Sequence, residues 1–141
     1  MIIPKTKTKN FNLHEIIHRL DNFDLNKIGI AYIAMGYMQR LREELSLHFG
    51  KDVPLKITSG YRELEYNRSI KSPDSSYHVW RYQDSEVLWA IDFRPIGIST
   101  ADVYEYLTKT TPFNGELYYH SKLDFIHIAP NGTVSKKPWI V

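Results

Sequence analysis

The sequence predicts an α+β fold, formed as a single domain over residues 1–141, with helices packed on one side of a mostly antiparallel sheet. Segments with the apolar spacing of helices come first in the chain, and segments with the alternation of strands come later. The connections between the later strands are short, which favours antiparallel neighbours. No repeat, low-complexity tract or linker divides the chain, so one domain is expected.

The first two predicted elements are helices. The first begins after Asn12, with Glu15 at the capping-box position, and its apolar face consists of Leu13, Ile16, Ile17 and Leu20. The second runs from about residue 26 to 48 and ends at Gly50. Its buried stripe is expected to contain Ala31, Ala34, Met35, Met38, Leu41 and Leu45.

After Pro54 the pattern changes to that of strands and turns. Residues 55–58 alternate like a strand and end at the turn signal Ser59-Gly60. Residues 62–70 have the pattern of a short helix. Residues 71–88 are polar and aromatic without a clear period, so we expect a long loop there.

The remainder of the chain predicts most of the sheet. Strands are expected at residues 89–94, 116–120 and 124–129, the last two joined by a tight connection. A helix capped by Ser99 or Thr100 separates the first of these strands from the other two. Pro130-Asn131-Gly132 predicts a further turn before residues 133–134.

The composition excludes several classes of protein. Cysteine is absent, so any metal ion must be held by histidines and carboxylates. The net charge of +2 comes without a basic stripe, which argues against a nucleic-acid partner. No apolar run approaches the roughly 20 residues that span a bilayer, and the N-terminal residues lack the apolar segment of a signal peptide. We therefore expect a monomer that is cytoplasmic at synthesis and binds no membrane.

Three segments contain the residues with chemical potential: Ser59-Gly60-Tyr61-Arg62; Ser76-Tyr77-His78 with Ala90-Ile91-Asp92-Phe93-Arg94; and Asp124-Phe125-Ile126-His127-Ile128. Asp92 and His127 each stand between apolar residues in a predicted strand. A carboxylate at Asp92 that faces inward must be paired or bound to a metal ion. If Ile126 and Ile128 face the core, His127 points the other way, into a cleft.

In this order the segments resemble the M15 metallopeptidases, which include D-Ala-D-Ala carboxypeptidases, D-Ala-D-Ala dipeptidases and phage L-alanyl-D-glutamate endolysins. The shared pattern is Ser-Gly-Tyr-Arg at a strand end, then Ser-x-His-x-x-Gly-x-Ala-x-Asp, then an acidic residue three positions before a final histidine. It extends from about residue 11 to 128. The resemblance implies a D,D-peptidase/hedgehog-like fold and a zinc ion (Zn2+) bound by His78, Asp92 and His127. Such a ligand set leaves a fourth position for water.

The resemblance also implies that Asp124 is the general base, with Glu116 as the alternative. Side chains three apart in a regular strand face opposite sides, so Asp124 can join His127 only if the strand begins after Asp124 or contains a bulge. His120 is an alternative metal ligand.

The chain departs from the family pattern between His78 and Asp92. Thirteen residues separate the two, where the family has six, and Leu88 occupies the expected glycine position. Asp84 lies within the inserted segment, but the family context surrounds Asp92 and not Asp84.

Four residues are expected on the substrate side of the site. The resemblance implies that Arg62 stabilises the oxyanion or holds a substrate carboxylate, and that Ser76 donates a hydrogen bond to the substrate. Trp80 and Tyr82 lie in the inserted segment and are expected to form a wall or lid over the substrate. The alternative for the segment is a hairpin or loop that packs sideways onto the sheet.

These features lead us to expect a zinc peptidase, carboxypeptidase or endopeptidase, that cuts next to a D-amino acid in peptidoglycan. A phage or prophage lysin, released by a holin or carried in a virion, fits this expectation. The alternatives are a non-catalytic metal-binding or structural module of the same fold and a cytosolic D-Ala-D-Ala-type dipeptidase.

Overall fold

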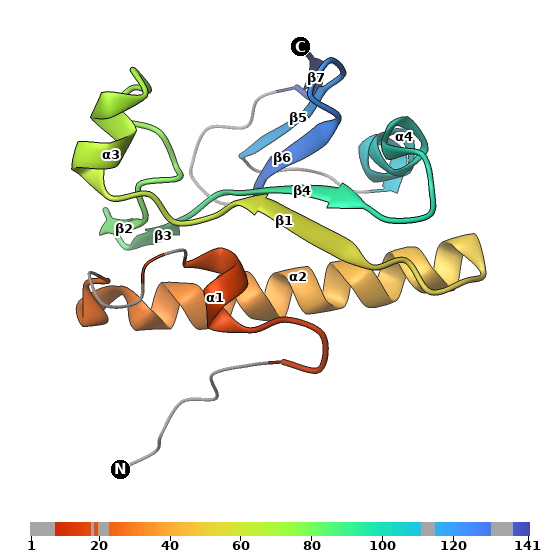
Figure 1. Cartoon of the computed structure of the whole chain (residues 1–141), viewed down its shortest axis with the longest axis horizontal. Helices are drawn as coiled ribbons and strands as arrows, with labels where there is room; N and C mark the ends of the chain where they lie inside the picture. The colour runs from red at the N-terminus through yellow and green to blue at the C-terminus, as the bar shows by residue number, and fades with distance from the viewer. Residues whose placement is uncertain (1–7, 18, 20–22, 111–114, 131–136) are drawn as a thin grey trace.

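The computed structural model describes residues 8–17, 19, 23–110, 115–130 and 137–141, and it has the predicted α+β architecture (Figure 1). In chain order the elements are α1 (Leu13–Ile16), η2 (Leu25–Lys27), α2 (Ile28–Phe49), β1 (Leu55–Ser59), α3 (Leu64–Ser69), β2 (Arg81–Gln83), β3 (Glu86–Leu88), β4 (Ile91–Pro95), α4 (Thr100–Thr110), β5 (Glu116–His120), β6 (Phe125–Ala129) and β7 (Trp139–Ile140).

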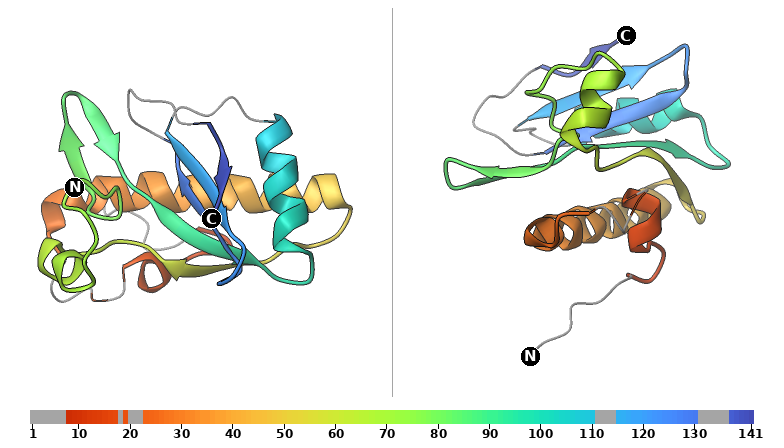
Figure 2. Two further views of the ribbon diagram at one scale, coloured as in Figure 1. Left: turned by 90° about the horizontal axis from the view of Figure 1, so that it is seen from above. Right: turned by 60° about the vertical axis from the view of Figure 1, so that its left-hand side comes forward.

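The main sheet has five strands in the order β1-β4-β6-β5-β7. All neighbours are antiparallel except β5 and β7, which confirms the mostly antiparallel prediction. α1 and α2 cover one face, and α3 lies on the opposite side (Figures 1 and 2). α4 lies on the same face of the sheet as α1 and α2. Its Tyr104 packs on Tyr119, and Tyr119 pairs across β5 and β6 with the core residue Ile126. One face of the sheet therefore carries the core, and the other is left for the site.

α2 follows from its sequence as predicted. The six residues of the expected stripe are all buried. Full burial of a large apolar side chain contributes about 1.5–3 kcal/mol, so this stripe fixes the helix against the sheet. Gly50 ends α2 in the left-handed conformation, with φ of 69°.

The N-terminal helix is shorter than its periodicity suggests. α1 ends at Ile16, and the predicted position Leu20 lies outside the described residues. The Glu15 carboxylate accepts the backbone N–H of Asn12 at 3.1 Å, which is one half of the predicted capping box. The predicted turn at Asn131-Gly132 and the segment 133–134 also lie outside the described residues.

The long loop predicted for residues 71–88 is wrong in its second half, because β2 and β3 form a two-stranded hairpin there. Its two turn residues, Asp84 and Ser85, are both left-handed, with φ of 50° and 64°. That conformation suits a tight hairpin, but Asp-Ser is not one of the usual glycine-containing signals.

Trp80 does not form part of the expected lid, and residues 81–88 form a hairpin, as one form of the alternative had it. Trp80 is fully buried, its indole N–H donates to the Ala90 carbonyl at 3.4 Å, and its ring meets Tyr61 edge-on. The Tyr82 hydroxyl lies over Gly29, at the beginning of α2. Because a side chain buried in the core cannot contact substrate, the lid expectation is wrong for Trp80. Tyr82 is 55% exposed, and its hydroxyl faces the beginning of α2.

Within the described residues, no helix is both long and apolar enough to cross a membrane.

Candidate metal centre

The register of two central strands brings Asp92 and His127 together. β4 and β6 pair so that Asp92 lies directly opposite His127. Their neighbours Ile91 and Ile126 are fully buried in the core. Because successive side chains on a strand alternate, the two polar residues both project from the other face, as the sequence predicts for His127.

His78 comes from the loop before β2 and is held by several backbone contacts. Its carbonyl accepts the backbone N–H of Arg62 at 2.8 Å, and its own N–H donates to the Ser76 hydroxyl at 3.3 Å. Its Nδ1 lies 2.8 Å from the carbonyl oxygen of Gly60, just beyond β1. The backbone N–H of Tyr61 in turn donates to the Ile16 carbonyl of α1. The end of β1 thus connects His78 to the core.

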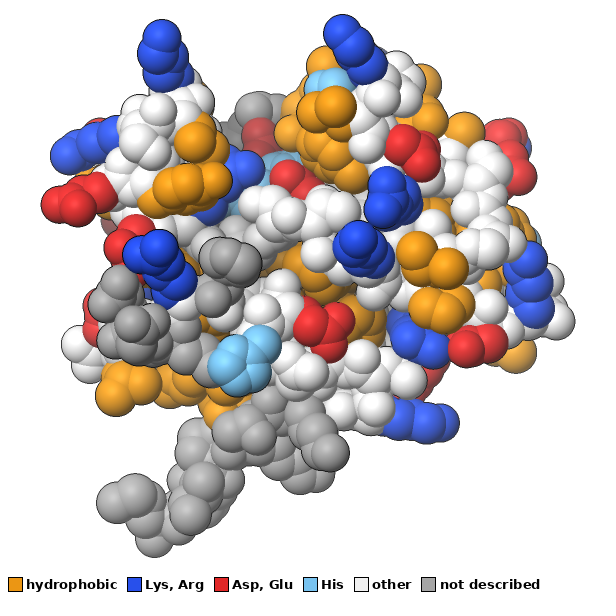
Figure 3. All heavy atoms as spheres, viewed as in Figure 1, with side chains coloured by type: hydrophobic (Ala, Val, Ile, Leu, Met, Phe, Trp, Pro, Cys, Tyr) orange, Lys and Arg blue, Asp and Glu red, His pale blue; other side chains and the backbone are white. Residues whose placement is uncertain are grey.

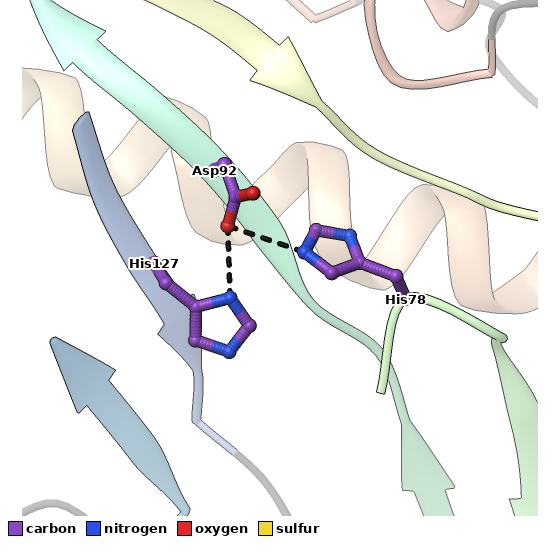
Figure 4. A group of neighbouring side chains, drawn as sticks. All are labelled: His78, Asp92 and His127. Atoms are coloured by element: carbon purple, nitrogen blue, oxygen red, sulfur yellow. Dashed lines mark hydrogen bonds and ion pairs between the residues drawn. The ribbon is translucent and has the colours of Figure 1, made fainter. Parts of the chain in front are cut away.

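The three residues form one compact buried group (Figure 4). Oδ1 of Asp92 lies 2.8 Å from Nδ1 of His127 and 3.2 Å from Nε2 of His78. Their exposed fractions are 3% for His78, 5% for Asp92 and 4% for His127. Within the part of the chain that the structure describes, this is the one group of three or more such residues spaced to hold a metal ion.

The hydrogen-bond partners determine which ring nitrogens carry hydrogens. The Gly60 carbonyl can only accept, so Nδ1 of His78 donates, and in the neutral ring Nε2 presents a lone pair to Asp92. Glu116 lies 3.3 Å from Nε2 of His127, and its carboxylate likewise requires a hydrogen there. The Nδ1 lone pair of His127 then faces the same Asp92 oxygen. Two lone pairs and a carboxylate converge on one buried point, which only a cation, proton or metal, can stabilise.

The pKa values respond to the same arrangement. Burial alone would raise the pKa of Asp92, but the hydrogen bonds with His127 and His78 outweigh it and hold the pKa well below its usual range. Burial alone would lower the pKa of His127, but the hydrogen bonds with Asp92 and Glu116 outweigh it and raise the pKa. The site therefore favours an ionised carboxylate and a positive charge beside it.

A comparison of the sequence with models of known protein families identifies the family of the chain. The family model described as peptidase M15 matches residues 9–129, which include His78, Asp92 and His127. The chain belongs to the peptidase M15 family. Membership implies a metal-dependent peptidase, a hydrolase that acts on a peptide. Comparison with curated proteins and with solved structures gives no match.

The donor set of this M15 peptidase fits a zinc ion. Ligand atoms on a tetrahedral zinc with bonds of about 2.0–2.1 Å lie roughly 3.3 Å apart. The Asp92–His78 distance of 3.2 Å is close to this value, and the Asp92–His127 distance of 2.8 Å is shorter. The outer nitrogens of both imidazoles already have acceptors, Gly60 for His78 and Glu116 for His127. Such outer partners orient metal-binding histidines, and the Glu116–His127 pair has the usual carboxylate–histidine form.

Tyr118 also contacts the group formed by His78, Asp92 and His127, the candidate metal-binding group. It lies opposite His127 across the β5–β6 pair, and the two rings stack with centroids 4.5 Å apart and planes at 13°. Burial, followed by the charges of Asp92 and Glu116, raises the pKa of Tyr118 to about 12, and Arg62 opposes this shift. The alternation of β5 could have placed Tyr118 and Glu116 on one face, but nothing in the sequence indicates the stack.

Asp124 is not brought to the three residues. β6 begins at Phe125, as the expectation required, but Asp124 lies in the preceding turn, exposed, with φ of 57°. Its carboxylate lies 3.5 Å from the hydroxyl of Tyr119, on the core side of β5. The alternative acid, Glu116, is the one in contact with His127.

The two other residues considered as ligands also lie apart from the group. Nδ1 of His120 accepts the backbone N–H of Leu123 at 3.1 Å, and its ring stacks on Phe125. Asp84 occupies the exposed turn of the β2–β3 hairpin.

Arg62 and Ser76 both contact the backbone of His78. The Arg62 N–H donates to the His78 carbonyl, and the Ser76 hydroxyl accepts the His78 N–H within the loop. The Arg62 guanidinium lies 3.5 Å from the side-chain oxygen of Asn67. Asn67 is fully buried in α3, and its amide donates to the carbonyl of Pro73 at 2.7 Å, a role that the sequence does not reveal. In Figure 3, histidine, acidic and basic side chains gather in a hollow between the parts of the surface formed by α3 and by the β5–β6 hairpin.

A second hollow lies between α1 and β1, with a volume of about 590 Å3. It is bordered by Gly60 and Arg62, but none of the three metal-binding residues lines it. His78, Asp92 and His127 therefore do not face this cavity, although Arg62 borders it.

Proposed function

We propose that the chain is a zinc peptidase that hydrolyses a peptide bond next to a D-amino acid in peptidoglycan stem peptides. The convergence of His78, Asp92 and His127 on one buried point supports the metal. The resemblance of Ser59-Gly60-Tyr61-Arg62 and the flanking motifs to wall-lytic M15 enzymes supports the substrate. In this proposal the protein acts as a phage or prophage lysin that reaches the wall through a holin or a virion.

The chain's own residues divide the chemistry among them. His78, Asp92 and His127 would hold the zinc ion, which would supply an activated water and polarise the scissile carbonyl when bound. Arg62, next to His78 in space, stabilises the negative charge that develops on the carbonyl oxygen. A planar guanidinium can equally hold a substrate carboxylate through two hydrogen bonds.

We assign the proton transfer to Glu116 rather than Asp124. Glu116 is the acid that lies against the metal-binding group, with its side chain 20% exposed. It takes the proton of the attacking water and returns it to the amine as the C–N bond breaks. Asp124 points to the opposite face of the sheet, so this proposal gives it no part in the reaction.

The function is tested with purified protein, by elemental analysis and by release of soluble products from purified peptidoglycan. We expect one zinc per chain, and we expect His78→Ala, Asp92→Ala and His127→Ala each to lose metal and activity. His120→Ala is the matched control, because this histidine lies on β5 outside the group. Full zinc content in all three variants would show that the ligand assignment is wrong.

The products decide the finer class. Release of single D-amino acids indicates a carboxypeptidase, and cleavage within the stem indicates an endopeptidase. Activity on free D-Ala-D-Ala with none on intact wall would instead support a dipeptidase. Zinc without any hydrolysis would support a non-catalytic module.

The proton-transfer assignment has its own test. Glu116→Gln keeps an oxygen for the Nε2–H of His127 but cannot take a proton, so zinc should stay while kcat falls roughly 10²–10⁴-fold. Asp124→Asn should turn over like the wild type. If Glu116→Gln remains active, Glu116 only orients His127, and if Asp124→Asn is inactive, the base is Asp124.

A further inference from the structure

Four side chains from four adjacent strands form one row across the open face of the sheet. The registers place Asp92 opposite His127, His127 opposite Tyr118, and Tyr118 beside Trp139. Two of the four belong to the metal-binding group, so the row extends that group toward β7. The proposed function gives no role to the other two residues of the row, Tyr118 and Trp139.

The rings of His127 and Trp139 hold the Tyr118 ring between them. The ring lies against His127 at 4.5 Å and 13° on one side and against Trp139 at 4.9 Å and 30° on the other. Aromatic pairs at such separations attract each other beyond their area of contact, by about 0.5–1.5 kcal/mol. A ring held on both sides has little freedom, so the position of its hydroxyl oxygen is fixed.

The hydroxyl of Tyr118 is unused by the described part of the chain. It makes no hydrogen bond to any residue within the described ranges, and the residue is partly exposed. A phenol is longer than an imidazole, so the hydroxyl reaches farther from the sheet than the ring of His127 does. It lies within the electrostatic influence of Glu116 and Arg62, the two residues assigned to the reaction.

We propose that the Tyr118 hydroxyl donates a hydrogen bond to the peptide bound at the metal site, which makes Tyr118 a further substrate-contacting residue. This inference rests on the proposed peptidase function. The stacked rings fix the position of the donor, and Tyr118 lies directly opposite His127 in the row. The opposing explanation is that Tyr118 only packs against His127.

Tyr118→Phe removes the hydroxyl and keeps the ring. The matched control is Tyr119→Phe, the same change one residue along, on the opposite face of β5. The first measurement is calorimetric binding of the pentapeptide L-Ala-D-Glu-L-Lys-D-Ala-D-Ala to metal-free protein, which cannot hydrolyse it by the proposed route. We expect Kd to rise roughly three- to tenfold in Tyr118→Phe, the effect of one neutral hydrogen bond, and to stay unchanged in the control.

The second measurement uses zinc-loaded protein and the same peptide. Here kcat/KM should fall in Tyr118→Phe by at least the factor seen in Kd, with zinc affinity unchanged. Equal Kd in wild type and Tyr118→Phe overturns the proposal, and so does a loss of zinc affinity, because the residue would then act through His127. If wild-type zinc protein hydrolyses nothing, the peptidase function fails, while the binding comparison still decides whether Tyr118 contacts the peptide.

Discussion

Gly60→Ala tests how the core holds the metal site. A Cβ at Gly60 would overlap the carbonyl oxygen of Ile16 and lie 2.9 Å from its carbonyl carbon and Cα. These are backbone atoms at the end of α1, so they cannot rotate away as a side-chain tip could. Either α1 or the segment after β1 must move.

Two hydrogen bonds are lost by that movement. The Tyr61 N–H leaves the Ile16 carbonyl, and the Gly60 carbonyl leaves Nδ1 of His78, each now at 2.8 Å. Overpacking and the two lost hydrogen bonds together should lower the free energy of unfolding by about 2–6 kcal/mol. Loss of an outer partner of a metal-binding histidine should weaken zinc affinity by roughly 10–100-fold.

The measurements are urea unfolding of the metal-free protein and zinc affinity by competition with a chelator. Gly36→Ala is the matched control, because a Cβ there meets no described atom within 4 Å. Gly36 is inside α2, so the control should be stabilised by roughly 0.5–1 kcal/mol. A Gly60→Ala protein with wild-type stability and zinc affinity would refute the idea that this contact positions His78.

Three further outcomes are expected. Arg62→Lys should bind zinc normally yet lower kcat/KM, because lysine keeps the charge and loses the planar fork; unchanged steady-state kinetics would reduce Arg62 to a supporting role. Trp80→Ala should lose about 3–5 kcal/mol of stability, as a fully buried tryptophan does, whereas Tyr82→Ala should leave kinetic constants per folded molecule unaltered; altered constants in Tyr82→Ala would revive the lid. Removal of metal with a chelator should lower Tm, and excess zinc should restore it; a melting curve indifferent to both would contradict a metal site in the folded state.

The part of the site that lies in regular strands could be predicted from the sequence. Asp92 and His127 alternate with apolar neighbours, and alternation alone assigns them to the face opposite the core. The same alternation predicts that, in a regular strand, Asp124 and His127 face opposite sides of the sheet. It did not show where the Asp124 carboxylate would point, because a left-handed residue in a turn follows no strand periodicity.

What could not be predicted depends on contacts between distant segments. The β2–β3 hairpin has strands of three residues each and a turn without glycine, so it gives almost no local signal. The burial of Trp80 needs Tyr61 and Phe23 beside it. The contact of Glu116 with His127 likewise depends on the register of β5 against β6.

The hairpin explains how the spacing between His78 and Asp92 can vary without cost to the metal site. A hairpin returns the chain to where it left, so added residue pairs extend its tip and leave its base unchanged. Doubling even a flexible loop costs only about 0.6 kcal/mol of closure entropy. The exposed turn at Asp84-Ser85 is therefore a natural point for inserting a tag or a binding module. A wall-binding segment inserted there would be tethered to the enzyme without any of the three metal-binding residues having to move.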